Sequence, residues 1–479
     1  MKTVRQTLLM TAVVSIMGSA LLTGCGGGGD GSSQVEPLGS RYYGIWEREG
    51  YGDVIKIDQS GGRIYQYTRS SCLLANQGTA SEVAESLGDL RLSEDGTQLY
   101  SDPVEGAVFS THYNLREQLP ELCTEGQRIT TATAMQTFEH FQQNFADYYA
   151  FFNERGVDWN TQVSVAQGLI HDAMSDEDLF AVMAQMLSPL DDGHVQLSDR
   201  ETVYRPVSVR GANRVIEESF SLQNEFDDIQ SYANALNAQY WENLGDYLDD
   251  GSVETLDGAY PDRLIWGTIA EGQIGYLLIN SMAFFSPEAD GLHPQSNVDW
   301  LHTNMPDVLS DLANTDALIL DIRSNPGGQD EAALAIASYF VQQRHLFGSK
   351  QARSSAGDTN VQEAWIEPAS DNPYLKPVIL ITGEATGSAA EVFTLAMRSL
   401  PQVTHIGETT AGMVSDVLEK TLPNGWEIWL ANEVYFDSDG VNHEGTGIAP
   451  EVAVSTFSLE AISAGQNAAL DTALQLLED

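Results

Sequence analysis

From residue 264 onward, short apolar runs alternate with stretches of helical periodicity, and this alternation limits the folds available to the chain. A chain of this pattern buries each strand between helices, which predicts an α/β fold around a largely parallel sheet. In such sheets ligands bind beside the carboxyl ends of the strands. The strands are predicted at 274–279, 317–322 and 378–382, and the helices pass through 309–312 and cover 331–341 and 389–400.

The preceding residues divide into segments of different character. Short alternating strands broken by turns from 42 to 123 predict a small β-sandwich or barrel. Aromatic residues at helical spacing from 138 to 152 and a capped helix at 176–187 predict a helical part. We therefore expect a signal peptide at 1–24, a Gly/Ser linker at 25–38, a separate small β domain at 39–128, a helical subdomain at 129–210, an acidic helical insertion at 211–260 and the α/β core at 261–479.

The first residues are typical of an exported lipoprotein. Lys2 and Arg5 precede an apolar run, which ends in the lipoprotein cleavage box Leu-Thr-Gly-Cys at 22–25. Because the run is short for a spanning helix, we expect cleavage before Cys25 and lipid attachment to it. An uncleaved anchor helix is the alternative. The predicted location is the cell envelope, at the outer membrane facing the periplasm or at the cell surface in a Gram-negative host.

The other two cysteines and the charge agree with an exported protein. Cys72 and Cys123 form either a disulfide, which is stable outside the cytoplasm, or two buried thiols. The formal net charge of −46 repels nucleic acid, so no nucleic-acid partner is expected. The sequence has no spacing typical of a metal site, a phosphate loop or a dinucleotide fingerprint, so we predict no metal and no cofactor.

Two stretches follow predicted strands and could carry chemistry. After 317–322 comes Asn-Pro-Gly-Gly at 325–328, whose backbone N–H groups could face a developing oxyanion, although an ordinary tight turn has the same sequence. After 378–382, Ser388 stands at the start of a helix of small residues, where the helix dipole favours negative charge. Ser388 is therefore either a nucleophile or simply the helix cap.

Together these stretches resemble a known family. The chain is similar to the tail-specific (C-terminal processing) serine peptidases and the catalytic core of tricorn protease, in the motifs Asp-Ile-Arg at 321–323, Asn-Pro-Gly-Gly at 325–328, Gly-Ser-Ala-Ala-Glu at 387–391, Gly-Glu-Thr-Thr-Ala-Gly at 407–412 and Gly-Ile-Ala-Pro-Glu at 447–451. The resemblance covers about 264–455. It implies a crotonase-like α/β core, Ser388 as nucleophile, and an oxyanion hole formed by the N–H groups of Ala389 and of Gly327 or Gly328.

The chain departs from the processing peptidases at the general base. Those enzymes place a lysine directly after the motif that is Gly-Glu-Thr-Thr-Ala-Gly at 407–412 here, and this chain has Met413 at that position. The thioether of methionine cannot accept the serine proton. The tricorn-type relatives use a histidine, and Asp-Gly-His-Val resembles their histidine motif, which implies His194 as base. Glu444 stands at the position of their supporting glutamate. In tricorn, a serine directly before the histidine bridges the histidine and the glutamate. This chain has Gly193 at that position.

The expected activity is hydrolysis of peptide bonds in peptide or protein substrates, through an acyl-enzyme on Ser388. His443 and His405 are alternative bases, because both lie near the later motifs. An esterase would use the same residues. A non-catalytic carrier is the alternative from another class, because retinoid-binding proteins of the eye resemble the same core and the usual lysine base is absent here.

Overall fold

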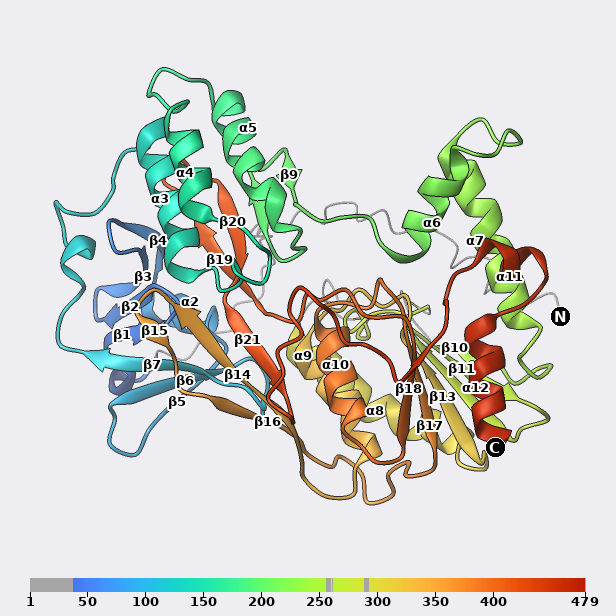
Figure 1. Ribbon diagram of the computed structural model, residues 1–479. Helices are drawn as coiled ribbons and strands as arrows, with labels where there is room; N and C mark the ends of the chain where they lie inside the picture. The colour runs from blue at the N-terminus through green and yellow to red at the C-terminus, as the bar shows by residue number, and fades with distance from the viewer. Residues whose placement is uncertain (1–37, 256–259, 261, 288–292, 479) are drawn as a thin grey trace.

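The computed structural model describes residues 38–255, 260, 262–287 and 293–478, so the predicted signal peptide and Cys25 lie outside the described residues. Figure 1 shows a β domain, a helical subdomain above it, and an α/β core to one side of both. No described helix combines the length and the apolar character needed to cross a membrane.

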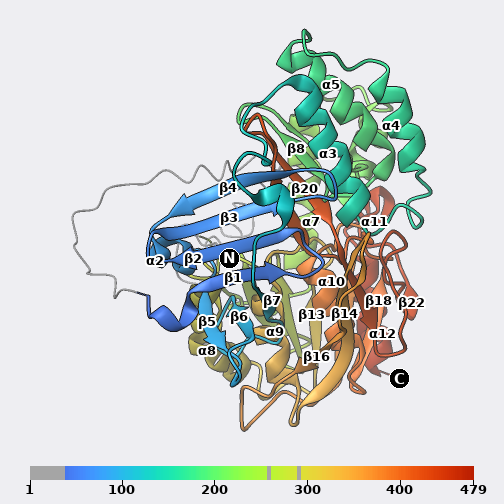
Figure 2. The same ribbon diagram turned by 90° about the vertical axis from the view of Figure 1, so that its left-hand side faces the viewer.

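The β domain is one antiparallel sheet of seven strands, ordered β4-β3-β2-β1-β7-β6-β5, and Figure 2 faces it. Its edge strands, β4 and β5, do not pair with each other within the described residues, so the prediction of a sandwich or barrel is wrong. The predicted disulfide between Cys72 and Cys123 is present and ties β4 to the turn η2. The elements are η1 (Ser40–Tyr42), β1 (Gly44–Arg48), β2 (Asp53–Asp58), β3 (Gly61–Tyr67), β4 (Cys72–Gly78), α2 (Ala80–Glu85), β5 (Asp89–Leu92), β6 (Gln98–Asp102), β7 (Thr111–Arg116) and η2 (Glu121–Cys123).

The helical subdomain packs against a second sheet built from two distant parts of the chain. Its aromatic core includes Phe145 and Trp159, whose rings lie 5.2 Å apart. The sheet has the order β19-β20-β8-β9, and in it Leu197 pairs with Ile428. This pairing brings the turn before β8 next to the C-terminal motifs. The elements are α3 (Ala134–Tyr148), α4 (Trp159–Gln167), α5 (Asp176–Leu187), η3 (Ser188–Leu190), β8 (Gln196–Ser198), β9 (Val203–Tyr204), β19 (Val417–Thr421) and β20 (Glu427–Ala431).

The core contains a seven-stranded sheet, ordered β10-β11-β12-β13-β17-β18-β22. Its strands are parallel from β12 to β22, as the alternating sequence pattern predicts, and antiparallel from β10 to β12. Leu318 and Leu320 face one apolar layer and Ile319 faces the other, so the sheet is buried on both sides. The strands are β10 (Glu254–Thr255), β11 (Leu264–Ile269), β12 (Ile274–Ile279), β13 (Ala317–Asp321), β17 (Val378–Thr382), β18 (Val403–Gly407) and β22 (Val452–Ala453).

Helices cover both faces of this sheet, and a smaller sheet joins the core to the β domain. Figure 1 shows α8, α9 and α10 on one face and α12 on the other. The smaller sheet pairs β14 with β15, β16 and β21. The elements are α6 (Gly211–Phe220), α7 (Ile229–Gly245), α8 (Pro294–Asp311), α9 (Asp330–Ala337), η4 (Ser338–Phe340), β14 (His345–Ser354), β15 (Gly357–Asp358), β16 (Gln362–Ile366), α10 (Ala389–Arg398), β21 (Glu433–Asp437), α11 (Leu459–Ser463) and α12 (Ala468–Glu478).

Candidate active site

Ser388 lies on a sharp turn between β17 and α10. Its backbone has φ 53° and ψ −131°, a conformation that costs a non-glycine residue free energy. Its N–H donates to the Met413 carbonyl at 3.0 Å, which holds the turn in place. The Ser388 side chain makes no capping hydrogen bond to α10. The hydroxyl is therefore not used as a helix cap.

The Ser388 hydroxyl meets the imidazole of His194. His194 Nε2 lies 3.0 Å from Ser388 Oγ, although the two residues are 194 positions apart in the sequence. His194 lies in the turn before β8, where its own N–H donates to Asp192 Oδ1 at 2.9 Å. Burial lowers the pKa of His194, and the negative charges of Asp192 and Asp416 oppose that shift. A neutral imidazole in this position can accept the serine proton at Nε2.

Glu444 lies in the same network but does not contact His194. Its carboxylate accepts hydrogen bonds from Arg155 Nη2 at 2.5 Å and from the N–H groups of Val414 and Ser415 at 2.8 and 3.1 Å. Burial raises the pKa of Glu444, and the Arg155 guanidinium opposes the shift. His194 Nδ1 has no hydrogen-bond partner among the described residues. The supporting role of Glu444, acting through water or another hydroxyl in place of the bridging serine, therefore stays a prediction.

Arg155 is the residue of this network that the sequence analysis missed. Its side chain is 5% exposed, and its Nη2 lies 2.5 Å from Glu444 and 3.8 Å from Asp192 Oδ2. Its guanidinium also donates to the carbonyls of Asp191 at 2.7 Å and Gly412 at 2.9 Å. Arg155 therefore joins the histidine turn to the C-terminal motifs. The available signal was a lone arginine after an aromatic cluster, in a chain with 23 basic and 69 acidic residues.

Two backbone N–H groups near Ser388 have no hydrogen-bond acceptor within the described residues. The Gly327 N–H donates to Asn325 Oδ1 at 2.9 Å, so it is engaged and unsuited to the role that the sequence allowed it. Within the described part of the chain, the N–H groups of Gly328 and Ala389 have no acceptor. A Cβ on Gly327 would lie 2.6 Å from Ser388 Cβ, so only glycine allows this close approach. Gly328 and Ala389 are the donors that this geometry leaves free for substrate.

The two departures from the relatives, Met413 and Gly193, pack against each other. The Gly193 N–H donates to Met413 Sδ at 3.1 Å. A Cβ on Gly193 would lie 2.5 Å from the same sulfur, so the methionine fills the space that a larger residue at 193 requires. The residues at 193 and 413 are thus sterically linked in this chain.

The alternative bases have other partners. His443 Nε2 lies 2.8 Å from Asp437 Oδ2, and His405 Nε2 lies 2.8 Å from the Thr382 hydroxyl. No cluster of three or more potential metal-ligating side chains occurs in the residues that the structure describes. Of the histidines proposed as base, His194 is the one placed against Ser388.

Two parts of the chain match known protein families. Peptidase family S41 matches residues 273–454, and the Tricorn protease C1 domain matches residues 130–188. The chain contains a peptidase family S41 domain. The matched ranges include Ser388 and Glu444 in the S41 domain and Arg155 in the C1 domain, and His194 follows the C1 domain.

Named relatives agree with this assignment. Over 134 residues, or 28% of each chain, the sequence is 29% identical to the carboxy-terminal processing protease CtpA of Bacillus subtilis. Over 187 residues, it is 24% identical to a carboxy-terminal-processing protease of Bartonella bacilliformis, covering 38% of this chain and 39% of that protein. The match thus spans well under half the length of either relative.

Solved structures show a similar fold. A crystal structure of a candidate peptidase from Parabacteroides merdae is 25% identical and has a TM-score of 0.56, covering 72% of this chain and 97% of that one. Mature CPAF, in complex with lactacystin, has the same fold at 12% identity and a TM-score of 0.51, covering 72% of this chain and 97% of that one.

Proposed function

We propose that the protein is a serine peptidase, with Ser388 as nucleophile and His194 as general base. Ser388 Oγ attacks the peptide carbonyl while His194 Nε2 takes its proton, and the new oxyanion accepts hydrogen bonds from Gly328 and Ala389. The C–N bond then breaks as His194 returns the proton to the leaving amine. A water molecule, deprotonated by His194, hydrolyses the acyl-enzyme and regenerates Ser388. The 3.0 Å contact between the hydroxyl and the imidazole carries this proposal.

A fluorophosphonate probe tests the proposal, because it reacts with an activated serine. The probe should label the purified protein, and Ser388→Ala should abolish labelling. His194→Ala should slow labelling by about 10²–10⁴-fold, the usual contribution of a general base. His443→Ala is the matched control and should label normally, since its imidazole pairs with Asp437. An unlabelled wild-type protein that binds apolar ligands would instead support the carrier alternative.

We also propose that the protein is an exported lipoprotein of the cell envelope, anchored through Cys25. The cleavage box at 22–25 supports export, and the Cys72–Cys123 disulfide fits an oxidising compartment. Cells fed an alkyne fatty acid should incorporate it into the wild-type protein, and Cys25→Ala should prevent incorporation. Lipid incorporation into the Cys25→Ala variant would overturn this assignment.

A further inference from the structure

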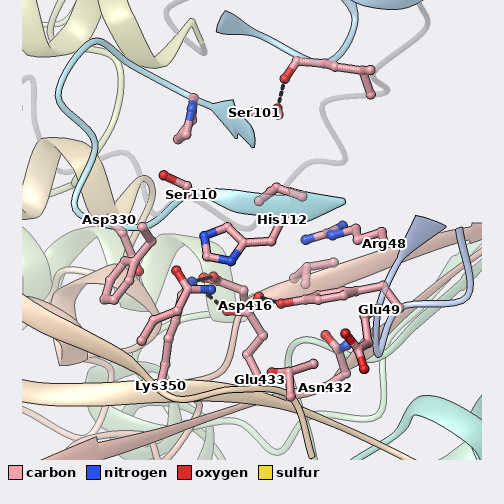
Figure 3. Close-up of a pocket in the computed structure, with 18 of the residues that line it drawn as sticks. Arg48, Glu49, Ser101, Ser110, His112, Asp330, Lys350, Asp416, Asn432 and Glu433 are labelled. Atoms are coloured by element: carbon pink, nitrogen blue, oxygen red, sulfur yellow. Dashed lines mark hydrogen bonds and ion pairs between the residues drawn. The ribbon is translucent and has the colours of Figure 1, made fainter. Parts of the chain in front are cut away.

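A cavity of about 450 Å³ lies between the β domain and the core. Figure 3 shows Arg48 and His112 of the β domain on one side and Asp416 and Glu433 of the core on the other. The volume is within the range of small-ligand pockets. The β domain lies outside both matched family ranges, so the comparisons assign this wall no role.

The cavity adjoins the catalytic residues. Gly328, one of the two free oxyanion donors, lines it, and the preceding Gly327 packs against Ser388. Asp416 lines the cavity too, and its charge acts on His194. A peptide whose carbonyl is placed between Gly328 and Ala389 would therefore bring a neighbouring side chain to the mouth of this cavity.

The lining holds more acidic than basic side chains. Two basic side chains, Arg48 and Lys350, line the cavity. Five acidic side chains line it as well: Glu49, Asp330, Glu331, Asp416 and Glu433. Lys350 Nζ is already engaged, at 2.7 Å from Asp416 and 2.6 Å from Glu433. Arg48 lies over the Tyr51 ring, 3.5 Å from its centroid. The basic groups of the lining are thus occupied by the protein itself.

Three of these side chains, Glu49, Asp330 and Glu331, form no ion pair within the described residues, and Asp330 accepts a hydrogen bond from the Tyr435 hydroxyl at 2.7 Å. Glu331, at the start of α9, forms no ion pair with any described residue. Burial and the nearby Asp416 charge raise its pKa, and the Lys350 charge only partly opposes the rise, so a substrate cation beside Glu331 would favour its charged form. Glu49 is held by the Asn114 side-chain amide at 2.9 Å and also forms no ion pair within the described ranges. A positive charge placed between the two walls would therefore gain attraction without displacing an existing ion pair.

We propose that this cavity is the subsite for a lysine or arginine side chain of the substrate, next to the cleaved bond, with the β domain as its outer wall. This inference rests on the proposed peptidase function. Glu331 and Glu49 supply the negative charge that recognises the side chain. The β domain, which has no catalytic residue, thereby acquires a role in substrate selection.

A peptide library tests the subsite. The library places either lysine or the uncharged norleucine at each position that flanks the cleaved bond, one position at a time. At one of these positions, the lysine peptide should have a kcat/KM at least tenfold higher than the norleucine peptide. Glu331→Gln should reduce this lysine-to-norleucine ratio about tenfold. With Glu331→Lys, peptides that carry glutamate at this position should become better substrates than those that carry lysine. Glu49→Gln, at an exposed position that tolerates change, should reduce it about threefold. Glu94→Gln removes the same charge from the β domain outside the cavity and should leave the ratio unchanged.

Two further readouts separate failure of the subsite from failure of the peptidase. Fluorophosphonate labelling of Ser388 reports the nucleophile whatever the substrate preference. If labelling succeeds but no flanking position prefers lysine or arginine, or if a free carboxylate is preferred, the subsite is overturned and the peptidase stands. The Ser388→Ala protein should bind lysine peptides at least fivefold more tightly than norleucine peptides by calorimetry. Equal binding would also overturn the subsite.

Discussion

At the scale of single residues, His194 works in an environment that opposes its charged form. It is 9% exposed, and burial lowers its pKa below the ordinary value of about 6.5. The nearby carboxylates of Asp192 and Asp416 limit this shift without contacting the ring nitrogens. The imidazole is therefore neutral, and ready to take the serine proton, throughout the neutral pH range.

This environment predicts the pH dependence of catalysis. Because the pKa of His194 is lowered, kcat/KM should stay constant as pH falls from 8 and should decline only below about pH 6.5, when the imidazole becomes protonated. Asp416→Asn removes a charge that raises this pKa, so it should move the decline to still lower pH. A pH profile of a chromogenic peptide checks both. A midpoint above pH 7, or an upward shift in the variant, would contradict the assignment.

Arg155 holds two buried carboxylates, and its loss should be costly. Arg155→Met leaves Glu444 and Asp192 without their cation, which should lower the unfolding free energy by about 3–5 kcal/mol. The deficit should shrink as pH falls, because burial raises the pKa of Glu444 and its protonation removes one unpaired charge. Guanidinium denaturation at pH 5 and pH 8 measures both effects.

A double variant is the control for this prediction. Adding Glu444→Gln to Arg155→Met removes one unpaired charge, so the double variant should recover part of the lost stability. If the two losses simply add, the ion pair does not determine the stability of the site.

The sequence pointed to the proposed nucleophile and base, which the structure places 3.0 Å apart, but not to the groups that hold them. Ser388 and His194 were recognised because each belongs to a short local motif. Arg155 acts through contacts to Glu444 and Gly412, which are more than 250 positions away, so no local pattern records its role. Gly328 could be preferred over Gly327 only once the Asn325 side chain was seen to accept from Gly327.

At the scale of elements, the turn from β17 to α10 carries the strain of the nucleophile. Ser388 has a positive φ that glycine adopts freely, whereas alanine suffers the same clash as serine. Ser388→Gly should therefore unfold with a free energy about 1 kcal/mol higher than Ser388→Ala, after allowing for the greater chain entropy of glycine. Chemical denaturation of the two inactive variants gives the difference. Equal stabilities would show that the turn is not strained.

Helices and strands were predicted correctly where the spacing of apolar residues was regular. The prediction failed where the fold depends on whether a sheet closes into a barrel. The helix at 176–187 and the strands at 274–279 and 378–382 agree with α5, β12 and β17. The β domain was predicted as a sandwich or barrel, because alternating strands look the same in an open sheet. Whether β4 meets β5 depends on sheet curvature, which the alternation does not encode.

At the scale of the whole molecule, buried contacts join the β domain to the rest of the chain. Lys420 of β19 is 1% exposed, and its Nζ lies 2.5 Å from Asp53 Oδ1 of β2. The Tyr51 hydroxyl donates to Glu433 of β21. Breaking these contacts would leave charges buried without partners, so the β domain and the core should not unfold independently.

This coupling predicts one cooperative unfolding transition, and the disulfide provides the test. The bond closes a loop with a sequence separation of 51, so Cys72→Ala/Cys123→Ala should cost about 2–5 kcal/mol. Although both cysteines lie in the β domain, calorimetry should show the whole transition moving to lower temperature. Hydrogen exchange should show β2 and β13 losing protection at the same temperature. Two transitions, of which only one shifts when the disulfide is removed, would mean that the β domain unfolds as an independent module. Its wall of the cavity could then open without disturbing the catalytic residues.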